Sequence, residues 1–244
     1  MIAASGGLLL VDKPGDWTSH DVVAVLRRLF ARGTKVGHTG TLDPLATGLL
    51  AVLVGPCTRL QARLQGFDKV YTGTIRLGVK TDTGDATGRV VATAPVPPLT
   101  LEGLGARLRE MTGRIEAPAP AYSAVKHKGR ALYDYARAGE AVPVKLRVST
   151  VHSWEALGWA APELSYRVSC SSGTYVRTLA ELLGERLGCG ATVSSLRRER
   201  IGPFDLADAK PLDALRALSP EAAARLLADS LPALERALTP APKR

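Results

Sequence analysis

The sequence is 244 residues long, and its 32 lysine and arginine residues against 23 acidic ones give a formal net charge of +9 at pH 7. A chain of this length buries a core without disulfide staples, and its three scattered cysteines are typical of neither a disulfide scaffold nor a zinc site. No apolar run is long enough to span a bilayer, and the excess of basic charge predicts a cytoplasmic protein with no membrane partner and a polyanionic ligand, most simply a nucleic acid.

Hydrophobic periodicity places strands and helices in alternation along the chain. In chain order, strands are expected at residues 7–14, 49–55, 69–79, 146–157, 163–173 and 191–204, and helices at 18–29, 100–113, 174–188 and from 219 onward. Thr18, followed three residues later by Asp21, marks the start of the first helix, and Ser219 before Pro220 marks the start of the last. The period-two pattern of the third strand puts Tyr71 on its apolar face.

Two segments, residues 81–90 and 117–143, interrupt this pattern. The first is a polar, turn-rich loop, and the second is bounded by prolines, rich in basic residues and tyrosine, and expected to be an irregular, exposed insertion. Because the elements alternate without a strict βαβ rhythm, their order predicts a mixed α/β fold of the α+β class. From residue 208 the composition shifts to alanine and leucine, so a helical tail is expected there.

Several familiar catalytic motifs are missing from the sequence. It holds no phosphate-binding loop, no dinucleotide fingerprint, no Gly-x-Ser-x-Gly elbow and no His-Glu-x-x-His zinc motif. The four histidines are not paired at ligand spacings. We therefore expect no essential metal and no small-molecule cofactor.

A single carboxylate, Asp43, stands in a glycine-rich stretch before an apolar strand. Pro44 pushes Asp43 towards extended backbone, while Gly40 and Gly48 allow tight turns on either side, so the carboxylate is held at a rigid corner. The local pattern alone favours a cap on a short helical turn with Pro44 at its first position. Capping and catalysis do not exclude one another, and both interpretations stay open at this point.

Two other places could supply what a catalytic carboxylate needs. Tyr175 and Arg177 are two residues apart, so at a strand end their side chains would leave the same face. An arginine beside a partly buried aspartate keeps the carboxylate ionised by lowering its pKa. Tyr71 could offer a ring on which a base stacks, although a strand tyrosine is more often plain core packing.

Five separated blocks within residues 6–203 resemble one enzyme family in their order and spacing. They are GLLLVDKPGDWTSHDVV, KVGHTGTLDPLATGLLAVLVG, DKVYTGTIRLGVKTDTGDATG, PAYSAVKHKGRALYDYAR and GTYVRTLAELLGERLG. This combination is similar to the bacterial TruB-type tRNA pseudouridine-55 synthases. The resemblance implies a pseudouridine synthase fold, in which a central, largely antiparallel mixed sheet carries flanking helices and an inserted thumb loop at about residues 117–143.

The implied activity is isomerisation of a specific uridine in the T-arm of tRNA to pseudouridine on a flipped-out base. By this resemblance Asp43 is the catalytic nucleophile, and Arg177 is the arginine that pairs with it. Tyr71 matches a tyrosine that stacks on the flipped base and is assigned to the later proton step at C5. Tyr175 belongs to the same motif as Arg177.

The resemblance also implies a set of residues that bind the RNA. His38 matches a histidine that contacts the region of the extruded nucleotide, and Leu196 falls near an apolar residue that lines the pocket. The thumb carries three cations suited to phosphate contacts, namely Lys126, Lys128 and Arg130.

The implied domain organisation is a catalytic domain at residues 1–205 and a short helical tail at 206–244. That tail is too short for the complete C-terminal PUA domain that family members commonly carry, and we expect a monomer. Isomerisation needs no redox change and no energy source, which agrees with the missing cofactor motifs. The residues leave open whether Asp43 attacks the sugar or the base or assists proton abstraction. The alternative function is a non-catalytic tRNA-binding or folding module on the same scaffold.

Overall fold

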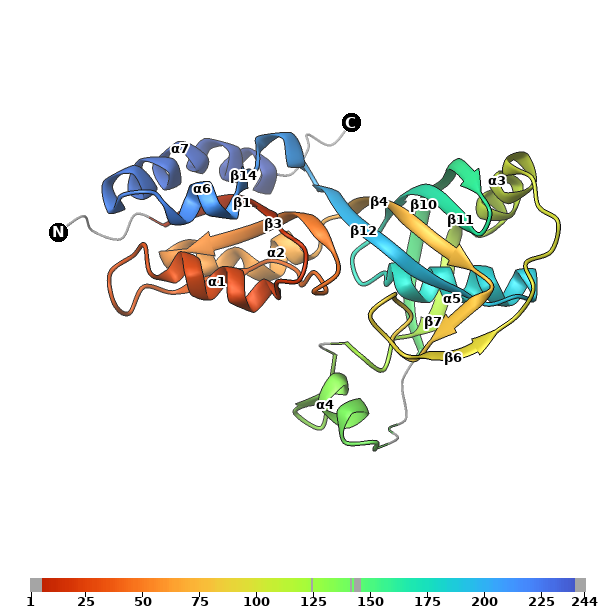
Figure 1. Ribbon diagram of the computed structural model, residues 1–244. Coiled ribbons are helices and arrows are strands. Elements are labelled where there is room, and N and C mark those ends of the chain that lie inside the picture. Colours follow the sequence, from red (N-terminus) through yellow and green to blue (C-terminus); the bar gives the residue numbers. More distant parts are fainter. Residues whose placement is uncertain (1–5, 124, 141, 143–145, 240–244) are drawn as a thin grey trace. The chain divides into compact units, whose positions relative to one another are not determined.

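The computed structural model describes residues 6–123, 125–140, 142 and 146–239, and the chain divides into two units (Figure 1). The first unit joins the two ends of the chain, Met1–Lys69 and Arg197–Arg244, and the second is the continuous stretch Val70–Leu196. Strand β12 (Ala191–Ile201) runs from the second unit into the first. Each unit is therefore described by itself.

The first unit contains short strands and helices from both ends of the chain. Its elements are β1 (Gly7–Lys13), α1 (Ser19–Arg27), β2 (Val36–His38), β3 (Thr47–Val54), the 3-10 helix η1 (Gly55–Leu60), α2 (Gln61–Gln65), the end of β12, β13 (Phe204–Asp205), the 3-10 helix η2 (Leu206–Asp208), β14 (Lys210–Pro211), α6 (Leu212–Arg216) and α7 (Pro220–Leu238). The strand order is β14-β1-β3-β12, in which β1 and β3 are antiparallel and the outer pairs β14-β1 and β3-β12 are parallel.

Helix α7, near the C-terminus, packs against the N-terminal strand β1. The Leu8 backbone N–H donates to Ser230 Oγ at 2.8 Å, and a side chain at Gly7 would collide with the backbone of Leu227. Leucines from β1, β3 and α7 share one core cluster with Phe204. The residues that the sequence predicts as a helical tail are thus packed into the first unit.

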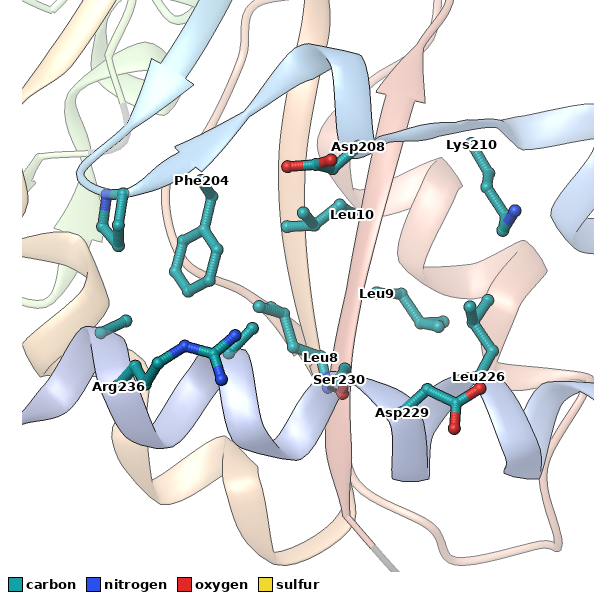
Figure 2. Close-up of a pocket in the computed structure, with 13 residues that line it drawn as sticks. Leu8, Leu9, Leu10, Phe204, Asp208, Lys210, Leu226, Asp229, Ser230 and Arg236 are labelled. Carbon is teal, nitrogen blue, oxygen red and sulfur yellow. Dashed lines mark hydrogen bonds between the residues drawn. The ribbon is translucent and has the colours of Figure 1, made fainter.

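A pocket of about 560 Å³ lies between β1 and α7, and none of the predicted site residues lines it. Figure 2 shows its lining, with leucines of β1 and Phe204 facing side chains of α7 such as Leu226 and Arg236.

The second unit is built on longer antiparallel strands. Its elements are β4 (Lys69–Leu77), β5 (Val79–Thr81), β6 (Val90–Thr93), α3 (Leu101–Glu110), β7 (Gly113–Pro118), β8 (Lys126–His127), β9 (Arg130–Ala131), α4 (Leu132–Arg137), β10 (Leu146–Ala160), β11 (Glu163–Cys170), α5 (Val176–Leu187) and the start of β12. The strand order is β12-β4-β11-β10-β7, with β10 antiparallel to both of its neighbours. Trp154 and Tyr166 meet edge to face in the core of this unit.

The elements confirm the predicted mixed α/β class, with a largely antiparallel mixed sheet and flanking helices. On β4 the alternation is as predicted, because Tyr71, Ile75 and Leu77 are all buried. The irregular insertion at 117–143 is a correction: its described part contains the β8-β9 hairpin and helix α4. Sequence patterns missed the hairpin because strands of two residues carry no detectable period.

The described helices include none that is both long and apolar enough to cross a membrane.

The start of α1 offers a test of the local reading of the sequence. Thr18 caps the helix, since the Asp21 N–H donates to Thr18 Oγ1 at 3.0 Å while the Thr18 N–H donates to the Asp21 carboxylate at 3.0 Å. Thr18→Ala removes one half of this capping box and is expected to lower the free energy of unfolding by about 1 kcal/mol in urea denaturation. Thr18→Ser, which keeps the hydroxyl, is the control, and equal losses in the two variants would contradict the cap.

Candidate active site

The predicted nucleophile, Asp43, lies in the loop that connects β2 to β3. Residues 43–46 form a tight turn, in which the Ala46 N–H donates to the Asp43 carbonyl at 3.0 Å, with Pro44 at the second position. The segment is not helical, so the cap on a helical turn that the local sequence favours is not formed. The side chain of Asp43 is half-buried at the corner of this turn.

Helix α1 and the end of β1 brace the Asp43 turn. Ser19 Oγ donates to the Leu42 carbonyl at 3.1 Å and accepts from the Leu42 N–H at 2.8 Å. The buried Lys13 ammonium donates to the Pro44 carbonyl at 3.2 Å and to two carbonyls at the end of β1. The residues on both sides of Asp43 are thereby tied to neighbouring elements.

The ammonium of Lys13 is the cation whose pKa responds to Asp43. Burial lowers the pKa of Lys13 from 10.5 to about 8, although the carboxylates of Asp16 and Asp43 act to raise it. At pH 7 the group is therefore protonated and keeps all the protons that it donates to the loop.

Arg198 of β12 is a third brace, from the far end of the chain. The side chain is 1 % exposed, and its guanidinium donates to the carbonyls of Leu49 at 2.7 Å, Gly40 at 3.1 Å and Thr41 at 3.4 Å. These three carbonyls lie on either side of Asp43 in the sequence. Gly48 permits this approach, because it has a φ of +95° and a side chain there would collide with the Arg198 backbone.

His38, at the end of β2, belongs to the same unit as Asp43. Burial lowers the pKa of its imidazole, and the nearby Arg198 guanidinium lowers it further. The Gly40 N–H points to His38 Nδ1 at 3.4 Å, so this nitrogen acts as an acceptor on a neutral ring. At neutral pH the side chain therefore offers hydrogen bonds without charge.

Tyr71 is in the second unit, on β4. Its side chain is 8 % exposed, on the face of the strand that also carries Ile75 and Leu77. The hydroxyl of the neighbouring Tyr166 is buried, and burial followed by proximity to Tyr71 raises the Tyr166 pKa. Within the described residues this hydroxyl has no hydrogen-bond partner.

Arg177 is almost fully buried in the first turn of α5. Its guanidinium donates to the carbonyls of Thr83 at 2.6 Å and Tyr122 at 2.8 Å, and its Nε lies 3.8 Å from Asp85 Oδ2. Asp85 is 5 % exposed and accepts hydrogen bonds from the hydroxyl of Thr83 and the N–H of Thr87. The orientation of Arg177 is thus fixed within the second unit, and its pairing with Asp43 stays a prediction.

Tyr175 and Arg177 do not share a strand face, contrary to the expectation from their spacing. Tyr175 is the N-cap residue of α5, and Arg177 is already helical. Residues two apart on a helix point about 200° apart, so the two side chains diverge. Leu196, which is 8 % exposed, lies on β12 within the second unit.

The three predicted phosphate-binding cations of the thumb differ in how they are used. Lys126 and Lys128 are exposed at the β8-β9 hairpin. Arg130 instead pairs with both oxygens of Glu140 at 3.0 and 3.1 Å and lies 4.3 Å from the centre of the Tyr135 ring. The hairpin therefore offers RNA two unengaged lysines, while Arg130 stabilises the thumb itself.

Sequence reasoning missed two residues that position the predicted site. Asp85 was part of a loop interpreted only as polar, although a carboxylate between two threonines, in TGDAT, is the signal that could have found it. Arg198 was counted within a basic cluster with Arg197 and Arg200. The alternation of β12 buries Arg198, Arg197 binds Asp12 at 2.8 Å, and Arg200 lies 4.0 Å from Asp205, so this cluster is not a free basic patch.

Two family models match consecutive parts of the chain. The TruB family pseudouridylate synthase N-terminal domain matches residues 27–176, and the tRNA pseudouridylate synthase B C-terminal domain matches residues 177–241. The chain belongs to the TruB family. The match extends the resemblance of residues 6–203 into the C-terminal helices.

Curated TruB relatives are similar over most of their length. The tRNA pseudouridine synthase B of Aromatoleum aromaticum is 50 % identical over 222 residues, which are 91 % of this chain and 71 % of that protein. The protein of the same name from Opitutus terrae is 48 % identical, over 91 % of this chain and 92 % of its own.

Solved structures agree with the family and its fold. A chain in the structure of an H/ACA RNP bound to a substrate RNA containing 2'-deoxyuridine is 27 % identical with a TM-score of 0.64, covering 86 % of this chain. A chain in the crystal structure of a Cbf5-Nop10-Gar1 complex is 30 % identical with a TM-score of 0.66. This chain spans about half the length of each of these, 52 % and 53 %. The predicted pseudouridine synthase fold is confirmed.

Proposed function

We propose that this protein isomerises a uridine in the T-arm of tRNA to pseudouridine and that Asp43 is the nucleophile. The family is that of tRNA pseudouridine synthases, which are isomerases. The reaction breaks the glycosidic bond between N1 and the ribose, turns the base, joins C5 to the same carbon and releases the C5 proton. No electrons are transferred, so the chain needs no redox group for this chemistry.

The observation that carries the assignment is the bracing of the Asp43 turn. Ser19, Lys13 and Arg198 hold the backbone on both sides of the carboxylate from three separate elements. A nucleophile gains most of its effect from being held in place beside the reacting atom. A turn that served only to connect two strands would not require a buried arginine and a buried lysine.

The partner is the polyanionic RNA that the net charge of +9 predicts. Exposed cations for phosphate contacts are present at Lys126 and Lys128 of the thumb. As a tRNA-modifying enzyme the protein would act in the cytoplasm, and we propose that it does so as a monomer.

The decisive experiment is release of tritium from a T-arm stem-loop labelled at C5 of its uridines, with and without EDTA. We expect stoichiometric release from one uridine under both conditions. Binding of the RNA with no release would support the non-catalytic alternative, and release only with a divalent ion on prefolded RNA would contradict a metal-free reaction.

Tyr71→Phe separates stacking from proton transfer at the base. The variant keeps the ring that would stack on the flipped base but loses the hydroxyl, so we expect near-normal RNA affinity and little product. Tyr71→Leu also removes the ring and is expected to weaken RNA binding further, by about 1 to 3 kcal/mol. The measurements are filter binding and single-turnover pseudouridine formation, and full turnover by the Phe variant would remove the hydroxyl from the mechanism.

A further inference from the structure

A small pocket lies within the second unit at the N-terminal end of α5. Its volume is about 20 Å³, and strands β7 and β10 form its other wall. Arg147 is paired with Ala117 and Ser149 with Ile115 across these strands, so the four side chains share the face that lines the pocket. These are the strands that lead into and out of the thumb.

The helix end at this pocket carries an uncompensated positive charge. Helix α5 has twelve residues, and no side chain caps its N-terminus. The nearest candidate, Thr174, donates its hydroxyl to the Ser171 carbonyl at 2.9 Å instead. The N–H groups of a first helical turn and the helix dipole together favour an anion at such an end.

A second, independent feature is the hydroxyl of Thr178, which also lines the pocket. Thr178 is 8 % exposed, and its Oγ1 has no hydrogen-bond partner among the residues that the structure describes. Burial of a hydroxyl without a partner is unfavourable, so the site is built for an incoming acceptor or donor. Arg147, which is exposed, forms no ion pair with any described residue and adds a positive charge at the mouth.

These groups together select the ligand. A hydroxyl, free N–H groups and a guanidinium all donate to an anionic oxygen, and about 20 Å³ holds one oxygen atom with its electron shell. Tyr175, which the family resemblance places in substrate binding, lines the same pocket.

We propose that this pocket receives a non-bridging phosphate oxygen of the RNA substrate. The inference rests on the proposed function, because it names a contact of the same substrate. The phosphate is held beside the root of the thumb, where binding of RNA to the thumb and to α5 is coupled.

The test uses the whole protein and a T-arm stem-loop, whose affinity is measured by filter binding at several salt concentrations. Arg147→Gln is expected to weaken binding and to lower the slope of log affinity against log salt by about 0.7 to 0.9, the release of one counterion. Thr178→Val, which keeps the shape of the side chain, is expected to weaken binding several-fold with an unchanged slope, and Thr178→Ser to restore it. Arg186→Gln removes the same charge at the exposed far end of α5 and is the control.

The outcomes separate this proposal from the proposed function. Wild-type product formation with an unchanged slope in Arg147→Gln and unchanged affinity in Thr178→Val would overturn the phosphate site and leave a pocket for water only. A lowered slope in a wild-type protein that makes no pseudouridine would support the pocket and overturn the enzyme. Absence of RNA binding by the wild type would overturn both.

Discussion

Asp43→Asn is expected to make no pseudouridine while it folds and binds RNA like the wild type. Asparagine keeps the size and polarity of the side chain but loses its charge and its nucleophilicity. The turn at residues 43–46 is closed by a backbone hydrogen bond and braced by other residues, so the melting temperature should hardly change. The measurement is single-turnover product formation with enzyme in excess, beside a binding curve and a melt of the same preparation.

The matched control for this variant is Asp16→Asn in the same unit. Asp16 is exposed with a φ of 61°, a conformation that asparagine adopts readily, and its carboxylate also acts on Lys13. Its activity should be that of the wild type, which shows that loss of an acidic charge near Lys13 is not what stops the reaction. A rate for Asp43→Asn within about tenfold of the wild type, which is about 1.4 kcal/mol in the barrier, would overturn the nucleophile assignment.

Arg198→Met is expected to cost both stability and activity. The substitution leaves the carbonyls of Gly40, Thr41 and Leu49 without their buried donor, so the free energy of unfolding should fall by roughly 3 kcal/mol or more. At a temperature where the variant is still folded, the loosened Asp43 turn should lower the single-turnover rate by at least 100-fold. Urea denaturation and product formation give the two measurements.

Two further variants give the Arg198 prediction its controls. Arg198→Lys keeps the charge but lacks the planar fork that reaches three carbonyls, so its losses should be intermediate. Arg200→Met removes the exposed arginine two residues along β12 and should change stability by no more than about 0.5 kcal/mol. A folded Arg198→Met variant with the wild-type rate would show that the brace is dispensable.

Local patterns predicted the elements whose signals lie within a few residues. The cap at Thr18, the alternation of β4 and the start of α7 at Ser219 and Pro220 each follow from contacts or faces within one turn or one strand. The same method placed Tyr175 and Arg177 on one face, because sequence alone did not fix where the extended segment ends and α5 begins.

The supports of the candidate site could not be predicted in the same way. Arg198 is separated by 158 residues from the Gly40 carbonyl that it binds, and Arg177 by 94 from the Thr83 carbonyl. Such pairs are set by strand order and burial, which hydrophobic periodicity does not encode. Family resemblance supplied Asp43, Tyr71 and Arg177 as residues, but only the fold shows what holds Asp43 and Arg177 in place.

The joining of both chain ends in the first unit has a consequence for the order of events during synthesis. The second unit is one continuous stretch, so it can fold on the ribosome as soon as it emerges. The Leu8 N–H must wait for Ser230, which is made 222 residues later, and the turn around Asp43 must wait for Arg198. We therefore expect the predicted nucleophile to be the part of the nascent chain that matures last, so that an incomplete chain can present RNA-binding residues before it can react.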